Sequence, residues 1–139
     1  MIFAVPSDFE KVKSIFYSHK KWFPHVRTDY MKRMIANKKL ILEDGILITF
    51  HHCKRKQKIG DVQAYKDDCI LHQIAAKGKG TASDVLQNFF KYVNRRVYLS
   101  VRSDNDIAKN FYLRNNMKLI GKTSWAKGTL PGDVYVYNG

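Results

Sequence analysis

The chain has 139 residues, of which 45% are hydrophobic and 13% aromatic, and its 25 Lys and Arg outnumber 12 Asp and Glu to give a formal net charge of +13. This length suits a single domain, residues 1–139, that buries a core without metal or disulfide support, and this composition excludes an intrinsically disordered chain. No apolar run approaches the roughly 18 residues of a membrane span and no secretory leader is evident, so we expect a cytoplasmic protein that does not bind membranes.

The N-terminal part of the chain predicts a short strand followed by two helices. Residues 1–5 are apolar and β-prone, and Ser7 with Glu10 has the spacing of a capping box that opens a helix. The apolar residues that follow recur at three and four positions, and this helix is expected to end before Trp22. Thr28 or Asp29 then caps a second helix that ends near residue 37.

The middle of the chain predicts a β-hairpin and then a long connection. Residues 39–43 and 46–51 are two β-rich runs separated by Asp44-Gly45, a dipeptide that suits the positive φ angles of a tight turn. These strands are therefore expected to pair antiparallel. The stretch 54–68 has no strong period, and we expect a connection there with a possible short strand.

The second half predicts alternating strands and helices, which implies parallel pairing, and then a closing hairpin. A stripe of apolar residues at helical spacing starts at Ala82, and residues 97–101 alternate as a half-buried strand. We expect a strand at 69–75, a helix at 82–93, a strand at 97–101, a helix opened by Ser103 or Asp104 that ends near 115, and strands at 118–125 and 134–137.

The excess of positive charge is spread over both halves of the chain, with one dense cluster. Lys54, Arg55, Lys56 and Lys58 lie within five residues, and such a cluster attracts polyanions, so a nucleic-acid partner is possible there. A solvated loop is the more common reason for a run of this kind.

The histidines and cysteines do not predict a metal site. His51, His52, Cys53, Cys69 and His72 are the residues considered, and the alternation of side chains along a strand prevents them from forming a complete tetrahedral set. We therefore expect no metal, and we expect both cysteines to be reduced thiols because no leader or CxxC motif accompanies them.

A glycine-rich loop stands between the predicted strand at 69–75 and the helix that follows it. Gly78 and Gly80 permit a tight turn, and the first amide groups of a helix from about Thr81 have no intrahelical partner, which favours an anion such as phosphate. Lys77 and Lys79 add positive charge. Neither a P-loop nor a complete dinucleotide-binding fingerprint is present, and a simple sharp turn would use the same glycines.

With these residues the sequence resembles the GNAT superfamily of N-acetyltransferases. The family has an [Arg/Gln]-x-x-Gly-x-[Gly/Ala] loop, which residues 77–82 match at Gly80 and Ala82 with Lys77 in the first position. It also has a helix with the pattern Asn-x-x-Ala-x-x-Phe-Tyr-x-[Lys/Arg]-x-Gly-Phe. The matching residues here are Asn105, Ala108, Phe111, Tyr112 and Arg114, and Asn116 and Met117 replace the closing Gly-Phe. Asn is the next residue after Gly to favour the left-handed conformation of a helix end.

The resemblance implies an α/β fold: a single mixed, mostly antiparallel sheet flanked by helices, with a parallel pair of strands that splay apart at the site of acetyl-coenzyme A (acetyl-CoA). It also implies that acetyl-CoA is the cosubstrate, with no metal. The cofactor contacts that it assigns are Gln73, Ile74, Ala75, Lys77, Gly78, Lys79, Gly80, Thr81, Ala82, Asn105, Ala108 and Tyr112.

By the same resemblance, Tyr112 is the general acid that protonates the leaving thiolate, and the backbone amide of Ile74 stabilises the oxyanion. The general base is not defined by the sequence. His72 is a weak candidate, and a bound water is equally suitable. The carboxylates considered are Glu43, Asp67 and Asp68.

The acceptor is expected to be a primary amine of a small molecule, peptide or protein. The segments 22–30 and 125–133 should select it, and Trp22, His25, Arg27 and Tyr30 are the residues considered. A monomer and a homodimer are both compatible with the sequence. The alternative function is a basic nucleic-acid-binding module, or a transferase acting on an RNA-linked substrate such as an aminoacyl-tRNA.

Overall fold

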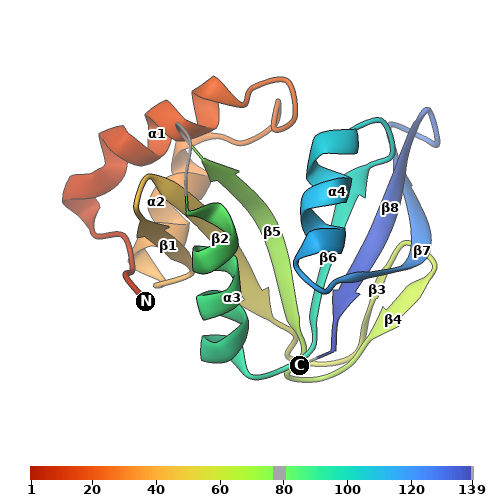
Figure 1. The fold of residues 1–139 in the computed structure, drawn as a ribbon. Helices are drawn as coiled ribbons and strands as arrows, with labels where there is room; N and C mark the ends of the chain where they lie inside the picture. Colours follow the sequence, from red (N-terminus) through yellow and green to blue (C-terminus); the bar gives the residue numbers. More distant parts are fainter. Residues whose placement is uncertain (77–80, 139) are drawn as a thin grey trace. The chain divides into compact units, whose positions relative to one another are not determined.

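The computed structural model describes residues 1–76 and 81–138 and has the predicted α/β architecture, a mixed sheet flanked by helices (Figure 1). The larger sheet has six strands in the order β1-β2-β5-β6-β8-β7, and β3 and β4 form a separate two-stranded hairpin. Strands β5 and β6 pair in parallel, whereas the β1/β2, β6/β8 and β7/β8 pairs are antiparallel.

The helices are α1 (Phe9–Ser18), α2 (Thr28–Ala36), α3 (Ala82–Val93) and α4 (Asp106–Arg114). The strands are β1 (Leu40–Glu43), β2 (Ile46–His52), β3 (Gln57–Ile59), β4 (Val62–Ala64), β5 (Cys69–Ala76), β6 (Val97–Arg102), β7 (Lys118–Trp125) and β8 (Leu130–Tyr137).

The chain packs as two compact units. The first comprises residues 1–50 and 72–85, and the second comprises residues 51–71 and 86–139. In the first unit, the predicted apolar faces of α1 and α2 are buried together, and Val12, Phe16 and Met31 are almost inaccessible to solvent. Leu40, Leu47 and Ala75 belong to the same hydrophobic cluster.

The N-terminus differs from the prediction in two details. Residues 1–5 do not form a full strand, and instead Phe3 makes an isolated antiparallel bridge to Ile41. Ser7 does not cap α1, because winding already begins in a short 3₁₀ turn at Pro6–Asp8, where proline supplies the required φ. The carboxylate of Asp8 accepts the Val5 amide at 2.9 Å and so caps that turn.

The hairpin of β1 and β2 has the turn that Asp44-Gly45 predicts. Asp44 has a φ of 53° and Gly45 a φ of 75°, so both residues are left-handed, as in the turns that match the twist of paired strands. Leu42 therefore pairs with Leu47 and Glu43 with Ile46 in antiparallel register.

The second unit contains a hairpin that the sequence did not reveal. Strands β3 and β4 fall within the connection predicted at 54–68, and the Asp61 carboxylate accepts the Lys122 amide of β7 at 2.8 Å. Gly60 turns the hairpin with a φ of 61°, and a Cβ there would lie 2.2 Å from the Lys122 carbonyl oxygen. The hairpin is thus held by contacts with a segment distant in sequence.

The closing hairpin is also longer than predicted. Strand β8 begins at Leu130 rather than at residue 134, although Pro131, Gly132 and Asp133 are poor strand formers. Pairing with β6 and β7 on both sides overrides these propensities, and Gly132 leaves room for the ring of Trp125, which a Cβ would approach to 2.4 Å.

Candidate active site

Helix α4 carries the second of the two family motifs, and both of its ends are set by asparagine. Asn105 is the N-cap, and its Oδ1 accepts the Ala108 amide at 3.3 Å, so the predicted caps Ser103 and Asp104 are wrong. Asn116 has a φ of 67°, the left-handed conformation expected where the family has glycine. The Met117 amide donates to the Tyr112 carbonyl at 3.1 Å, which completes a Schellman motif.

Tyr112 lies in the last turn of α4 and is only 7% exposed. Its ring contacts that of Phe111 and also that of Tyr135 on β8, with centroids 5.9 Å apart. Burial raises the pKa of Tyr112 well above its ordinary value, and the neighbouring Tyr135 contributes in the same direction. The phenol therefore keeps its proton throughout the physiological pH range, which a general acid requires.

A pair of amide side chains joins α3 to the end of α4 in the second unit. Asn115 is almost fully buried, and its Nδ2 donates to the Phe111 carbonyl at 2.9 Å. Gln87 Nε2 donates to both the carbonyl and the Oδ1 of Asn115 at 3.2 Å. These contacts hold the turn that contains Tyr112. The sequence did not predict a role for Gln87 or Asn115, because the hydrogen bonds between them join residues that are distant in sequence.

The other end of α4 is held by a charged cluster around Asp133 on β8. The buried Asp133 carboxylate accepts the Ser103 hydroxyl at 2.8 Å, and it pairs with Lys122 at 2.7 Å and Lys109 at 3.2 Å. The hydrogen bond from Lys122 is the main cause that lowers the pKa of Asp133 to about 2, and those from Ser103 and Lys109 act in the same direction. Asp133 had been placed in a loop by the sequence, so this role was not predicted.

In the first unit, Gln73 on β5 is the centre of a polar network. Its Oε1 accepts the Tyr30 hydroxyl of α2 at 2.9 Å and also the Thr49 hydroxyl of β2, while its backbone amide donates to Thr49 Oγ1 at 3.1 Å. Thr49 is fully buried, and burial raises the pKa of Tyr30. Gln73 and Tyr30 were predicted as site residues for different substrates, and the structure joins them both directly and through Thr49, a polar residue within an apolar strand.

The end of β5 is contacted by a histidine that is not among the predicted site residues. His19 follows α1 directly, and its Nε2 lies 2.6 Å from the Ala76 carbonyl oxygen. Since a carbonyl can only accept, Nε2 must carry the proton in this contact. Ile74 and Ala75 lie on the same strand, Ile74 half-buried and Ala75 buried.

The base candidates have different surroundings. His72 is exposed on β5. Glu43 pairs with the N-terminal ammonium at 3.7 Å, Asp67 pairs with Arg95 and Asp68 pairs with Arg96, both at 3.4 Å. Each of the three carboxylates thus has a positively charged partner.

Several predicted cofactor-binding residues precede α3 in the sequence or begin it. Lys77, Gly78, Lys79 and Gly80 lie outside the described residues. Thr81 is exposed, and its carbonyl accepts the Val85 amide at 3.0 Å, so the helical hydrogen-bond pattern begins there. Ala82 is the first residue of α3.

The segments expected to select the acceptor contain both exposed polar residues and partly buried aromatic residues. Trp22 is half-buried with the Lys21 ammonium 4.6 Å from its ring, whereas His25 and Arg27 are exposed between α1 and α2. In the second unit, Trp125 is partly exposed at the end of β7.

Over residues 1–76 and 81–138, no group of three or more His, Cys, Asp or Glu side chains is placed to hold a metal ion. Cys53 and Cys69 are buried, and they form no disulfide. None of the helices in the described ranges combines the length and apolar character that a bilayer crossing needs.

Comparison with known proteins gives structural matches alone, since no protein-family model and no curated protein sequence matches the chain. A GNAT-family acetyltransferase from Streptococcus agalactiae 2603 is similar with a TM-score of 0.78 at 13% identity, covering 99% of this chain and 93% of that one. A ribosomal-protein-alanine N-acetyltransferase from Brucella melitensis has a TM-score of 0.75 at 8% identity, covering 99% and 98%.

Arabidopsis thaliana NAA60 in complex with acetyl-CoA has a TM-score of 0.69 at 15% identity, covering 96% of this chain and 94% of that one. These likenesses extend over nearly the whole of each chain, although the sequences have diverged widely. The order of strands, the parallel β5/β6 pair and helix α4 agree with the architecture that the motifs implied. The chain therefore has the fold of the GNAT-family acetyltransferases.

Proposed function

We propose that the protein is an N-acetyltransferase that moves the acetyl group of acetyl-CoA to a primary amine by direct attack. The observation that carries this proposal is helix α4, where a buried Tyr112 with a raised pKa stands between an asparagine N-cap and a left-handed Asn116. The fold shared with an acetyl-CoA complex supports the same substrate. A non-catalytic nucleic-acid-binding module would not need a buried phenol at this position.

The proposed reaction forms a C–N bond and breaks a C–S bond. A neutral amine attacks the thioester carbonyl, and the backbone amide of Ile74 donates to the oxyanion of the tetrahedral intermediate. The intermediate collapses by expelling the thiolate, which takes the proton of the Tyr112 hydroxyl. His72 or a water takes the first proton from the incoming ammonium before the attack, and the positively charged nitrogen of the intermediate then loses its second proton to solvent to give the amide. Solvent returns a proton to the tyrosinate.

The timing of proton donation follows from the pKa of Tyr112. An ordinary phenol has a pKa about 1.5 units above that of an ordinary thiol, so transfer to a finished thiolate costs about 2 kcal/mol. Burial raises the pKa of Tyr112 and increases that cost. Donation is therefore expected to accompany C–S cleavage, while charge is still developing on sulfur, rather than to follow it.

In this proposal, acetyl-CoA is bound by backbone groups of Gln73, Ile74 and Ala75 on β5, which can pair with an amide-rich pantetheine arm. The phosphates are bound by amides and lysines at the start of α3, and Asn105, Ala108 and Tyr112 contact the cofactor from α4. Asn105 Oδ1 already caps the helix, so its Nδ2 is the group proposed to meet the cofactor. Residues 22–30 and 125–133 are proposed to select the acceptor.

The acceptor class that we favour is the N-terminal amine of a peptide or protein. The support is the similarity to the Brucella ribosomal-protein-alanine N-acetyltransferase. His25 and Arg27 are exposed polar residues that precede Tyr30 in the sequence, and their side chains can donate to the carbonyls of an extended peptide.

Two measurements test the proposal. Calorimetric titration with acetyl-CoA should show binding at physiological salt, and absence of binding would refute the proposed cosubstrate. Tyr112→Phe should lower kcat by about 10²-fold or more while changing the Kd of acetyl-CoA less than about threefold, because a general acid contributes about 10²–10⁴.

Tyr98→Phe is the matched control for this substitution. Tyr98 is also a buried tyrosine in the second unit, on β6 within the cluster of Ala64, Ile70 and Val136. The Tyr98→Phe variant should retain the kcat of the unaltered protein on a panel of peptides with free N-terminal amines. Equal losses of kcat in the two variants would indicate damage to packing rather than removal of an acid.

A further inference from the structure

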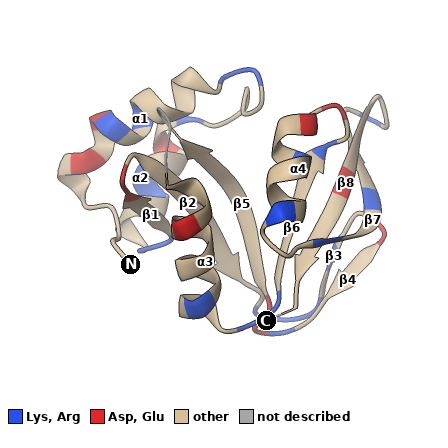
Figure 2. Ribbon diagram, in the orientation of Figure 1, with Lys and Arg blue, Asp and Glu red and all other residues tan. Residues whose placement is uncertain are grey.

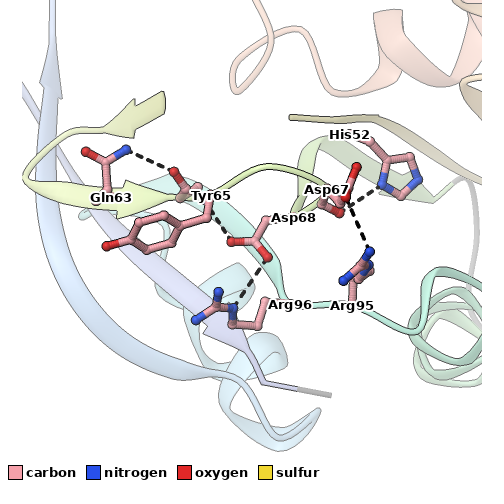
Figure 3. A network of polar contacts seen from close by, with 8 residues as sticks. His52, Gln63, Tyr65, Asp67, Asp68, Arg95 and Arg96 are labelled. Carbon is pink, nitrogen blue, oxygen red and sulfur yellow. Dashed lines mark hydrogen bonds and ion pairs between the residues drawn. The ribbon is translucent and has the colours of Figure 1, made fainter. Parts of the chain in front are cut away.

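Three short segments of the second unit meet on one surface. The Cys53 amide donates to the Asp68 carbonyl and the Asp67 amide to the Cys53 carbonyl, both at 2.8 Å. The Cys69 amide donates to the Arg96 carbonyl at 2.9 Å. These backbone bonds place Cys53, and with it the start of the basic cluster at 54–58, beside residues 67–69. Figure 3 shows Asp67 and Asp68 paired with Arg95 and Arg96.

The resulting surface is strongly positive. We define the basic surface as Lys54, Arg55, Lys56, Lys66, Arg95 and Arg96, all of which are exposed. Figure 2 shows Lys and Arg on the loops of the second unit that lie near the C-terminal end of the chain, where β6 begins beside the end of β8.

The carboxylates at the surface do not neutralise it. Asp67 pairs with Arg95 and Asp68 with Arg96, and these two negative charges face six positive ones. Asp68 is also buried and accepts the Tyr65 amide at 2.9 Å, so it acts as a structural support for the loop. Within residues 1–76 and 81–138, none of the ion pairs includes the three lysines of the basic surface.

An aromatic ring is held among these charges. Tyr65 is 51% exposed, and the Arg96 guanidinium carbon lies 5.7 Å from the centre of its ring. Asp68 holds both the Tyr65 amide and Arg96, so the ring and the cation are positioned by one buried carboxylate (Figure 3). A half-exposed ring beside a guanidinium is a surface on which a nucleobase can stack.

We propose that the basic surface and Tyr65 bind single-stranded nucleic acid, with phosphates on the lysines and a base stacked on Tyr65. A duplex keeps its base faces inside and cannot use the ring, whereas an acidic protein or a sulfated polysaccharide can use only the charge. The inference concerns binding and does not depend on acetyl transfer. It gives a role to the positive charges at residues 54–66 and 95–96, which are different from the lysines proposed to bind the cofactor.

The first experiment measures the salt dependence of binding. Fluorescence anisotropy with a fluorescein-labelled oligouridylate of about 15 nucleotides gives Kd between about 50 and 200 mM salt. The substitutions Lys54→Ala, Lys56→Ala and Lys66→Ala, made together, should reduce the slope of log K against log salt by about 2, since each phosphate contact contributes about 0.7 for single strands.

A matched triple variant controls for net charge. Lys11→Ala, Lys20→Ala and Lys118→Ala remove the same charge at exposed positions outside the basic surface, and the slope should change by less than about 0.5. Equal slopes for the two triple variants would refute the location. Absence of any oligouridylate binding by the unaltered protein at about 50 mM salt would refute the proposal itself.

The second experiment tests stacking. Tyr65→Leu should weaken oligouridylate binding at least about fivefold and leave heparin binding unchanged, and Tyr65→Phe should bind like the unaltered protein. The Tyr65 contact to Asp68 uses the backbone amide, so both variants keep it. Tyr17→Leu, at an exposed tyrosine of α1, is the control.

Two results would overturn the stacking step. Undiminished binding by Tyr65→Leu would show that the ring takes no part. Equal affinity for an RNA duplex of the same length would show that the surface recognises charge alone.

Discussion

The charged cluster around Asp133 makes a quantitative prediction about stability. The Asp133 side chain is 2% exposed and holds Lys122, Lys109 and Ser103 from β7, α4 and the segment before α4. The substitution Asp133→Asn keeps the size of the side chain and an acceptor for Ser103, and it removes the charge that the two lysines share. It therefore measures what the ionised carboxylate contributes to folding.

The magnitude follows from the lowered pKa. A decrease from 3.8 to about 2 corresponds to about 2.4 kcal/mol of stabilisation when the group is ionised, at about 1.36 kcal/mol for each pKa unit. Because the Lys122 side chain is 68% exposed and solvent screens its charge, we expect about 1–2 kcal/mol. A lowered folded-state pKa gives stability that is present above pH 3.8 and is lost as the pH falls through 2.

The assay is urea unfolding followed by far-UV circular dichroism and tryptophan fluorescence at pH 7, 5, 3 and 2. Asp133→Asn should be about 1–2 kcal/mol less stable than the unaltered protein at pH 7 and 5. This difference should fall by about half at pH 3 and should nearly vanish at pH 2. Parallel pH profiles for the two proteins from pH 7 to 2 would refute the reasoning.

Asp104→Asn is the control for a surface ion pair. Asp104 pairs with Arg102 at 2.9 Å, but its side chain is 61% exposed. Its substitution should change the free energy of unfolding by less than about 0.5 kcal/mol. A loss as large as that of Asp133→Asn would show that burial is not what distinguishes the two carboxylates.

Three further substitutions test the polar network and the ends of α4, each by urea unfolding. Thr49→Val should cost about 1–3 kcal/mol because it removes a buried hydroxyl that Gln73 contacts twice; a change below about 0.5 kcal/mol would contradict that role. Asn116→Gly should be neutral or stabilising and Asn116→Ala should cost about 1 kcal/mol, because φ is 67° there; the reverse order would contradict it. Asn105→Ala should cost about 1 kcal/mol, whereas Asn105→Asp keeps the cap on the Ala108 amide. If Asn105 Nδ2 also contacts the cofactor, both variants weaken acetyl-CoA binding, and an unchanged Kd for Asn105→Asp would refute that contact.

Local patterns were enough to predict most of the elements of this fold. The apolar stripe of α3, the left-handed turn at Asp44-Gly45 and the left-handed end of α4 at Asn116 depend on residues within a few positions of one another. Such features need no partner from elsewhere in the chain. For the same reason, the family motif in α4 could be read directly, and the fold that it implied is the one observed.

Predictions were wrong where a second local preference or a distant segment overrides the pattern. Ser7 has the spacing of a cap, yet the 3₁₀ turn at Pro6 starts the winding earlier. Strand β8 runs through Pro131 and Gly132 because it is paired on both sides. The β3/β4 hairpin has little apolar alternation and depends on Asp61 meeting β7.

The sequence by itself therefore predicted most of the elements and the buried helix faces, since these follow from spacing along the chain, and the family resemblance of α4 indicated the tyrosine proposed as general acid. Only the tertiary structure decided which polar groups act together. Thr49 and Gln73, Gln87 and Asn115, and Asp133 with its two lysines are pairs and clusters whose members lie far apart in sequence. The same holds for the positive charge noted at the outset: long-range backbone bonds place Lys54 and Arg96 on one surface, because hydrogen bonds and charges act through space rather than along the chain.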